Sequence, residues 1–231
     1  MGHLTGRVVL ITGAAGGLGR AVVAEFLNQG ARVWGVLAPG ETNPFPENAP
    51  AVLRADLSSP EQAAGAVREV LQAAGRLDAL VHLVGGFAGG EPVHQTSDEI
   101  WRRMMTLNLD TAFHIFRSAL PPMLEARRGR ILAIGTRTAV EPVAKLCAYN
   151  VSKAGLVALI RTLALEVKNT GVTANIVLPS VIDTPANRAA NPDADYSRWV
   201  KPELIAALLA FLASDAASDI NGAVIPIYGR A

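Results

Sequence analysis

The chain has 231 residues, enough for one large α/β domain or two small ones. Half of its residues are hydrophobic and 18% are charged, which excludes a generally disordered chain. Its formal net charge of +1 gives no strong field to attract nucleic acid or an anionic membrane. The single cysteine, Cys147, excludes an internal disulfide framework and a metal site built from several cysteines.

The sequence carries no membrane or secretion signal that we can identify. The N-terminal stretch MGHLTGRVVLITG lacks the long apolar run of a signal peptide. No apolar run approaches the roughly eighteen residues expected of a membrane span. We therefore expect a cytoplasmic protein that acts on a small molecule and has no nucleic-acid, membrane or metal partner.

Short apolar runs alternate with helical patterns along the whole chain. The runs predict strands at residues 7–12, 31–37, 51–56, 77–86, 130–135, 171–180 and 222–229. Helical spacing predicts helices at 18–30, 59–75, 97–128 with a break, 148–170 and 201–214. Gly30 is a candidate helix C-cap, and Ser59 before Pro60 is a candidate N-cap. Residues 38–50 hold four prolines and are predicted to form a loop.

This alternation predicts an α/β fold. Parallel strands joined by right-handed helical crossovers form a doubly wound, Rossmann-type sheet covered by helices on both faces. We expect one domain over residues 1–231, with a mainly parallel seven-stranded sheet. Ligands of such folds bind beyond the carboxyl ends of the strands, so the residues at those ends are the candidate site.

A glycine-rich turn, TGAAGGLG, follows the first predicted strand. A dinucleotide pyrophosphate needs close backbone approach and free N–H groups at a helix N-terminus, which side chains would obstruct. Glycine spacing alone also fits a simple tight turn, but the strand–turn–helix context favours nucleotide binding. The candidate cofactor-binding residues here are Gly13, Gly16, Gly17, Leu18 and Gly19.

Four other strand ends supply further candidates. Asp56, beside Leu57, can accept a hydrogen bond from the adenine amino group, or can simply begin the next helix. The glycines of GGFAGG, of which Gly85 and Gly86 are the first, allow the backbone to pass close to the ribose of a cofactor. A mobile loop would have the same composition. The remaining candidates are hydroxyls on Thr136 and Thr138 for substrate, and Pro179, Ile182 and Thr184 for cofactor.

Tyr149 and Lys153 are one helical turn apart in AYNVSKAG. Residues at i and i+4 lie on the same helix face, and a nearby ammonium lowers the pKa of a phenol. The alternative is a half-buried tyrosine beside a solvated lysine. The spacing of this pair does not distinguish a catalytic role from a structural one, so the other motifs of the chain are needed.

Taken together, these motifs resemble those of the short-chain dehydrogenase/reductase family over nearly the whole chain. TGAAGGLG is similar to its TGxxxGxG motif, and Tyr149 and Lys153 match its YxxxK. Thr136 lies at the spacing of its catalytic serine. Asp56 and Asn108 fall where the family has its adenine-contacting aspartate and its helix asparagine.

The resemblance implies hydride transfer between a nicotinamide and a carbonyl or carbinol carbon. Tyr149 would exchange the proton, and Lys153 would lower its pKa and bind the nicotinamide ribose. Thr136 would position the substrate oxygen, and Asn108 would hold a water behind Lys153.

The chain departs from the family pattern at several positions. Thr136 replaces the usual serine, and Thr138 is an alternative for that role. His82 and Leu83 stand where the family has asparagines, and Ser180 replaces a glycine. We favour a hydrogen-bonded core histidine over a catalytic one for His82.

The cofactor is predicted to be NAD or NADP, with NADH slightly favoured. An acidic residue at the end of the second strand would indicate NAD, but Leu37 and Ala38 stand there. No basic residue lies within the glycine turn, although Arg20 follows it and Arg54 could approach from the third strand. A 2′-phosphate without a nearby cation would be poorly bound.

Residues 183–199, with the GGFAGG loop, resemble a narrower group, the quinonoid dihydropteridine reductases. This implies an alternative substrate, a pterin, held against Phe87, Trp199 and Tyr196. A nucleotide-binding sensor or scaffold without turnover is the non-enzyme alternative.

The apolar helices at 107–128 and 148–170 also carry enough apolar surface to predict a homodimer or homotetramer.

Overall fold

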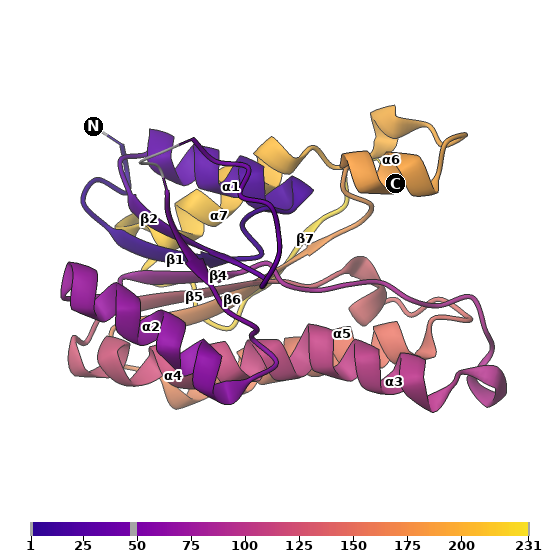
Figure 1. Cartoon of the computed structure of the whole chain (residues 1–231), viewed down its shortest axis with the longest axis horizontal. Coiled ribbons are helices and arrows are strands. Elements are labelled where there is room, and N and C mark those ends of the chain that lie inside the picture. The colour runs from indigo at the N-terminus through magenta and orange to yellow at the C-terminus, as the bar shows by residue number, and fades with distance from the viewer. Residues whose placement is uncertain (1, 47–49, 231) are drawn as a thin grey trace.

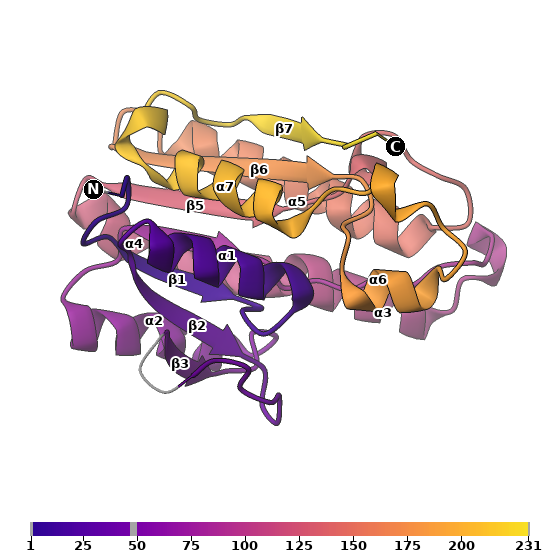
Figure 2. The same ribbon diagram turned by 90° about the horizontal axis from the view of Figure 1, so that it is seen from above.

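The computed structural model describes residues 2–46 and 50–230. Part of the predicted loop at 38–50, and both ends of the predicted domain, therefore lie outside the described residues. Its strands form one sheet in the order β3-β2-β1-β4-β5-β6-β7, with every neighbouring pair parallel (Figure 2). The strands are β1 (Val8–Thr12), β2 (Arg32–Leu37), β3 (Ala51–Arg54), β4 (Ala79–His82), β5 (Gly129–Ile134), β6 (Val172–Pro179) and β7 (Val224–Ile227).

Helices cover both faces of this sheet, as the sequence predicts (Figure 1). One face carries α1 (Gly17–Asn28) and α7 (Pro202–Ala213), which pack against each other. The other face carries α2 (Pro60–Ala74), α4 (Thr111–Glu125) and α5 (Cys147–Glu166). The two shorter helices α3 (Asp98–Met105) and α6 (Pro185–Ala190) lie toward the carboxyl ends of the strands (Figure 2).

The strands are buried on both faces, because alternate side chains enter two separate cores. In β1, Val8 and Leu10 pack beneath α2 and α4, whereas Val9 and Ile11 pack beneath α1 and α7. Both sets of side chains are fully buried. This two-sided burial explains why the strands read as continuous apolar runs in the sequence.

Local capping residues behave as expected. The Ser59 hydroxyl accepts a hydrogen bond from the backbone N–H of Gln62 at 3.2 Å, with Pro60 in the first turn of α2. Helix α1 ends at Asn28, and Gly30 follows with a positive φ of 86°. Only glycine adopts that backbone conformation without strain.

The structure differs from the sequence prediction in the long helical stretch 97–128. The expected break is a π-helical turn over Thr106–Asp110, so α3 and α4 continue through it without a loop. Helix α5 ends at Glu166 rather than near Thr170, because residues 167–171 turn into β6. Helix α6 was not predicted from the sequence.

Within residues 2–46 and 50–230, no helix is both long enough and apolar enough to cross a membrane. The same residues contain no group of three or more His, Cys, Asp or Glu side chains that could hold a metal ion.

Two arginines are buried at the amino-terminal edge of the sheet. Arg7 and Arg130 are 4% and 3% exposed, and both form ion pairs with the exposed carboxylate of Asp215. Arg128 lies 3.6 Å from the same carboxylate. A hydrogen bond from Arg7, with these three guanidinium charges, lowers the pKa of Asp215. Removing this carboxylate would leave two buried cations poorly compensated.

We therefore predict that Asp215→Asn lowers the free energy of unfolding at neutral pH by about 1–2 kcal/mol, a value discounted because Asp215 is solvent-exposed. The contribution is present above the ordinary aspartate pKa of 3.8 and is lost as the pH falls through the lowered folded value. Urea unfolding at neutral and acidic pH measures both effects. Asp98→Asn, which removes a fully surface pair with Arg102, is the matched control and should change stability by less than about 0.5 kcal/mol. Equal effects of the two substitutions would contradict the argument.

Candidate active site

Lys153 is the most buried charged group at the carboxyl edge of the sheet. It lies on α5, is 5% exposed, and its Nζ donates a hydrogen bond to the carbonyl of Ile134 at 3.1 Å. Ile134 is the last residue of β5. This bond therefore holds the middle of α5 against the end of β5, with half-buried Tyr149 one turn earlier on the same helix.

Thr136 meets the phenol from the same strand end. Its side chain is buried and hydrogen-bonded to the Tyr149 side chain. The hydroxyl of Thr138 is also buried, and it has no hydrogen-bond partner among the described residues. Of the two predicted threonines, the structure thus brings Thr136 and not Thr138 against Tyr149.

Asn108 lies in the π-helical turn, a feature often found at functional sites. Its Oδ1 accepts from the Gly86 N–H at 2.9 Å, and its Nδ2 donates to the Gly86 carbonyl and the Ser152 hydroxyl, both at 3.1 Å. The turn therefore aims an amide at the backbone after β4 and at α5. The sequence did not indicate Ser152.

The electrostatics of the pair differ from the sequence prediction. Burial lowers the pKa of Lys153 to about 8. Burial also raises the pKa of Tyr149, and the Thr136 hydrogen bond opposes that rise only in part. The expectation that Lys153 leaves Tyr149 with a lowered pKa is wrong for this arrangement of protein groups, because removing the phenol from water outweighs the groups that favour the phenolate.

His82 is a core residue, as the sequence analysis favoured. It is fully buried, with Nδ1 2.9 Å from the Thr12 hydroxyl and Nε2 3.5 Å from the Thr111 hydroxyl. Thr111 donates its own proton to the Leu107 carbonyl, so it accepts from Nε2–H and Thr12 donates to Nδ1. Burial, and next the Lys153 charge, lower the pKa of His82 to about 3, which keeps the ring neutral.

The glycine turn has the backbone that a dinucleotide requires. Gly13 has a φ of 66°, and a Cβ on Gly19 would lie 2.2 Å from the Gly13 carbonyl oxygen. Gly16 begins α1 with no side-chain cap, so the first N–H groups of the helix have no side-chain acceptor. A Cβ on Gly17 would lie 2.9 Å from the Thr184 side chain, so residues after β6 contact this turn directly. The turn therefore fits a pyrophosphate.

A cavity of about 500 Å³ extends from this turn along the carboxyl edge of the sheet. The predicted residues that line it are Gly13, Gly16, Leu37, Asp56, Leu57 and Gly85. The other predicted cofactor residues, Leu18, Gly86, Pro179, Ile182 and Thr184 among them, lie outside it. Several other lining residues were not predicted from the sequence, and of these Glu41 and Arg103 are charged.

Asp56 precedes α2 and lies at the wall of the cavity. It lines the cavity, and its Oδ1 accepts hydrogen bonds from the Ser58 N–H and hydroxyl at 2.9 and 2.7 Å, as a residue that begins a helix would. These hydrogen bonds lower its pKa. Asp56 is thus an ionised acceptor at the wall of the cavity.

Glu41 places an acidic group at the wall of the cavity, beyond the end of β2. It follows β2 in the proline-rich loop, and its Oε2 accepts from the Ala38 N–H at 3.0 Å. Arg54, from β3, donates to the carbonyls of Ala38 and Glu41 at 3.3 and 2.7 Å. The loop therefore folds back and places a carboxylate at the cavity while it engages the neighbouring guanidinium.

The segment after β6 is packed by its own residues. Asp183 and Arg188 form a bidentate ion pair at 2.6 and 2.9 Å, and Arg188 lies over the Tyr196 ring. The Tyr196 hydroxyl donates to the Pro192 carbonyl at 2.9 Å, and its ring contacts Trp199. Of the predicted aromatic wall, Phe87 contacts the Tyr149 ring, at 5.0 Å between centroids. Tyr196 instead holds its own segment together.

Comparison with known proteins points to one family. A family model described as enoyl-(acyl carrier protein) reductase matches residues 13–229. Short-chain dehydrogenase/reductase olcF of Penicillium canescens is 31% identical, over 98% of this chain and 97% of that protein. The cyclic-di-GMP-binding biofilm dispersal mediator protein of Escherichia coli is 34% identical, over 99% and 98%. The structure of a short-chain type dehydrogenase/reductase from Mycobacterium ulcerans superimposes with a TM-score of 0.90 at 28% identity, covering 98% of this chain and 90% of that one.

Gly85 provides a test of the packing around Lys153. A Cβ at this position would lie 2.9 Å from both Asn108 Oδ1 and Lys153 Nζ. We predict that Gly85→Ala lowers the free energy of unfolding by about 1–3 kcal/mol, because inserting a methyl group forces buried polar groups apart. Gly65→Ala, in the interior of α2 with only the flexible end of Arg68 nearby, is the control and should raise stability by roughly 0.5–1 kcal/mol. Urea unfolding measures both, and an unchanged stability of Gly85→Ala would contradict this packing.

Proposed function

The chain belongs to the short-chain dehydrogenase/reductase family and is an oxidoreductase of that type; we propose that it transfers hydride between a nicotinamide dinucleotide and a carbonyl or alcohol, with Tyr149 as general acid and base. The observation that supports this most directly is the Thr136–Tyr149 hydrogen bond beside the buried Lys153. It places two hydroxyls where a single substrate oxygen can meet both. The bound dinucleotide would supply the hydride.

Each residue then has one role. Tyr149 gives its proton to the substrate oxygen, and Thr136 orients that oxygen by donating a hydrogen bond. Lys153 stabilises the phenolate that remains after transfer. Asn108 positions the backbone of Gly86 and the Ser152 hydroxyl, both next to α5. These side chains come from separate strand ends and helices, so a substrate is held by the fold and not by one loop.

The raised pKa of Tyr149 favours the reductive direction at neutral pH. A phenol that remains protonated is ready to act as an acid, whereas oxidation of an alcohol first needs its deprotonated form. The pKa of Lys153, about 8, keeps most of the ammonium charged at neutral pH. We therefore propose carbonyl reduction as the favoured direction at that pH.

We propose NADH as the cofactor. The pyrophosphate would bind at the glycine turn, and Asp56 and Leu57 would meet the adenine end. Glu41, at the cavity wall beyond β2, has the charge to accept hydrogen bonds from a ribose and to repel a 2′-phosphate. Arg54 is next to this loop, but its guanidinium is engaged by two carbonyls.

Two alternatives remain as proposals. A pterin is the narrower substrate prediction, and of its expected aromatic wall only Phe87 contacts Tyr149 in the described part of the chain. A non-catalytic nucleotide-binding role is kept open by the relative that is named for binding cyclic-di-GMP. The presence of Tyr149, Lys153 and Thr136 argues against this role, because a protein without turnover has little chemical need for them.

Assembly as a homodimer or homotetramer also remains a proposal. Phe113 on α4 and Val151 on α5 are exposed, which is consistent with helix pairing between subunits. We also propose a cytoplasmic location. Light scattering would test the assembly.

The proton-transfer role is tested by Tyr149→Phe. We expect turnover of NADH with a panel of simple carbonyls and a quinonoid dihydropterin to fall by about 10²–10⁴-fold, because the substitution removes the hydroxyl that carries the transferable proton and keeps the ring. Fluorescence titration with NADH is the control and should give an unchanged Kd. Full turnover by a folded variant that binds NADH would refute the mechanism. An absence of turnover by the unmodified protein across the panel, with NADH bound, would support the sensor role instead.

The cofactor preference is tested by Glu41→Gln. We expect the unmodified chain to have the higher kcat/KM with NADH, and the substitution to reduce its preference over NADPH by about tenfold by removing a repulsive charge. Glu91→Gln, on an exposed loop that does not line the cavity, is the matched control. A preference for NADPH in the unmodified chain would contradict the proposal.

A further inference from the structure

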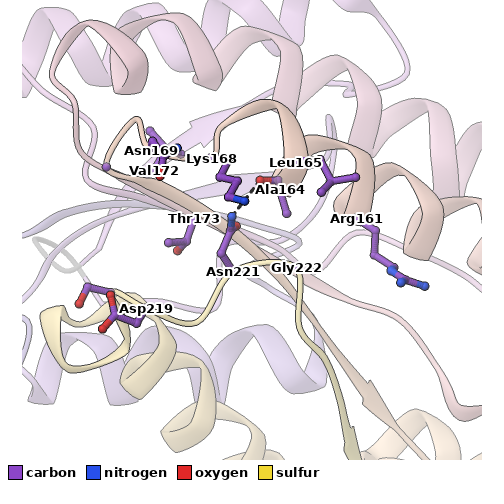
Figure 3. Close-up of a pocket in the computed structure, with 12 residues that line it drawn as sticks. Arg161, Ala164, Leu165, Lys168, Asn169, Val172, Thr173, Asp219, Asn221 and Gly222 are labelled. Atoms are coloured by element: carbon purple, nitrogen blue, oxygen red, sulfur yellow. Dashed lines mark hydrogen bonds between the residues drawn. The ribbon is translucent and has the colours of Figure 1, made fainter.

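A second large cavity lies at the opposite end of β6 from Tyr149. It measures about 570 Å³, is open to solvent, and is bordered by the C-terminal part of α5, the start of β6 and the turn at residues 218–222 (Figure 3). Strand β6 starts at this cavity and ends at Pro179, at the carboxyl edge of the sheet. No residue of the catalytic set lines it. Its size lies within the range typical of small-molecule sites.

Thr173 gives this cavity an unsatisfied hydrogen-bonding group. The residue is 4% exposed and lines the cavity, and its Oγ1 has no hydrogen-bond partner in the part of the chain that the structure describes. A buried hydroxyl without a partner costs stability, so such groups are uncommon and call for an explanation. A bound acceptor in the cavity would satisfy it.

Three backbone carbonyls of the lining residues already accept hydrogen bonds from side chains. The Ala164 carbonyl accepts from Asn221 Nδ2 at 2.8 Å, and the Gly171 carbonyl accepts from Arg130 Nη1 at 3.2 Å. The Asn169 carbonyl accepts from Arg127 Nη2 at 3.5 Å. These hydrogen bonds occupy carbonyl oxygens that a ligand could otherwise use. They also bring the guanidinium groups of Arg130 and Arg127 close to the lining residues of the cavity.

The charged side chains that line the cavity are mostly cationic. Arg161 and Lys168 form no ion pair or hydrogen bond with other described residues, and Asp219 is the one lining carboxylate there. Figure 3 shows Thr173 with Lys168 and Asp219 on either side of it. Leu165, which is 75% exposed, adds apolar surface to the wall. The cavity therefore offers donors and positive charge next to an apolar patch.

We propose that this cavity binds a small anion, through a carboxylate or phosphate group that accepts hydrogen bonds from Thr173 and Lys168. Arg161 adds attraction at longer range, and Leu165 contacts any apolar part of the ligand. Asp219 repels a second negative charge and so favours a singly charged group. This site is separate from the dinucleotide cavity and does not depend on the proposed reaction.

Backbone amide NMR with acetate and with inorganic phosphate distinguishes the two sources of the anion. We expect saturable shifts at residues 168–173 and 219–222 for at least one probe, with a Kd of about 1 mM or lower. Phosphate shifts at residues 13–19 would report the glycine turn separately. The expected pattern is absent if neither probe gives saturable shifts around Thr173, and that result would overturn the proposal.

Three substitutions make the assignment specific. Thr173→Val keeps the shape but removes the hydroxyl, and Lys168→Gln removes the charge; each should weaken the binding probe about tenfold. Asp219→Asn should strengthen binding, because it removes the repelling carboxylate. Arg68→Gln, an exposed cation on α2, is the control and should leave the Kd unchanged. Thr173→Val should fold at least as stably as the unmodified chain, so loss of binding would not reflect unfolding. Unchanged binding in Thr173→Val and Lys168→Gln would show an adventitious ion only and refute the site.

Discussion

The burial of the Lys153 ammonium is the constraint on which the candidate active site depends. A charged group that is removed from water must be compensated, and Lys153 has the Ile134 carbonyl at 3.1 Å for that purpose. The same bond fixes α5 against the end of β5, so the position of Tyr149 on α5 relative to Thr136 after β5 follows from it. The residual cost of burial appears as the lowered pKa of Lys153. A neutral residue of similar length would not need this bond, and the helix would lose one of its anchors to the sheet.

The neighbouring groups are arranged so that no second charge competes with Lys153. His82 lies on the adjacent strand, and two threonine hydroxyls fix its neutral tautomer. Asn108 contributes a neutral amide to the same region, where a carboxylate would carry charge. Its Oδ1 and Nδ2 atoms are hydrogen-bonded to Gly86 and Ser152. Gly85 separates Asn108 from Lys153 without adding a side chain. The site is thus a network of neutral partners around one cation, which explains why asparagine, histidine and glycine occur where larger or charged residues would be destabilising.

Most of the fold could be predicted from the sequence because its signals are local. The apolar runs, Ser59 before Pro60, and Gly30 after α1 each act within a few residues, and the parallel sheet follows from their order. Helical spacing could place Tyr149 and Lys153 on one face, whereas their roles and those of Thr136 and Asn108 were implied only by the family resemblance. The position of Glu41 at the cavity wall could not be predicted, because it depends on a loop that folds back onto Ala38, and loop conformation leaves no periodic pattern. The pKa of Tyr149 was predicted in the wrong direction for a related reason: spacing reveals the neighbouring charge but not the depth of burial, and here burial dominates.

Helix α5 and strand β6 each run from the second cavity toward the carboxyl edge of the sheet, where Tyr149 lies, yet this continuity alone does not couple the two sites. Between Thr173 and Pro179, β6 is buried along its whole length, and Ala174 and Ile176 are fully enclosed in the core beneath α5. A close-packed element of this kind has one arrangement, and a ligand shifts an equilibrium only if it binds two arrangements with different affinities. An anion beside Thr173 would therefore stabilise the folded chain as a whole. It would change the chemistry at Tyr149 only if α5 itself had a second position, in which the bond from Lys153 to Ile134 is broken.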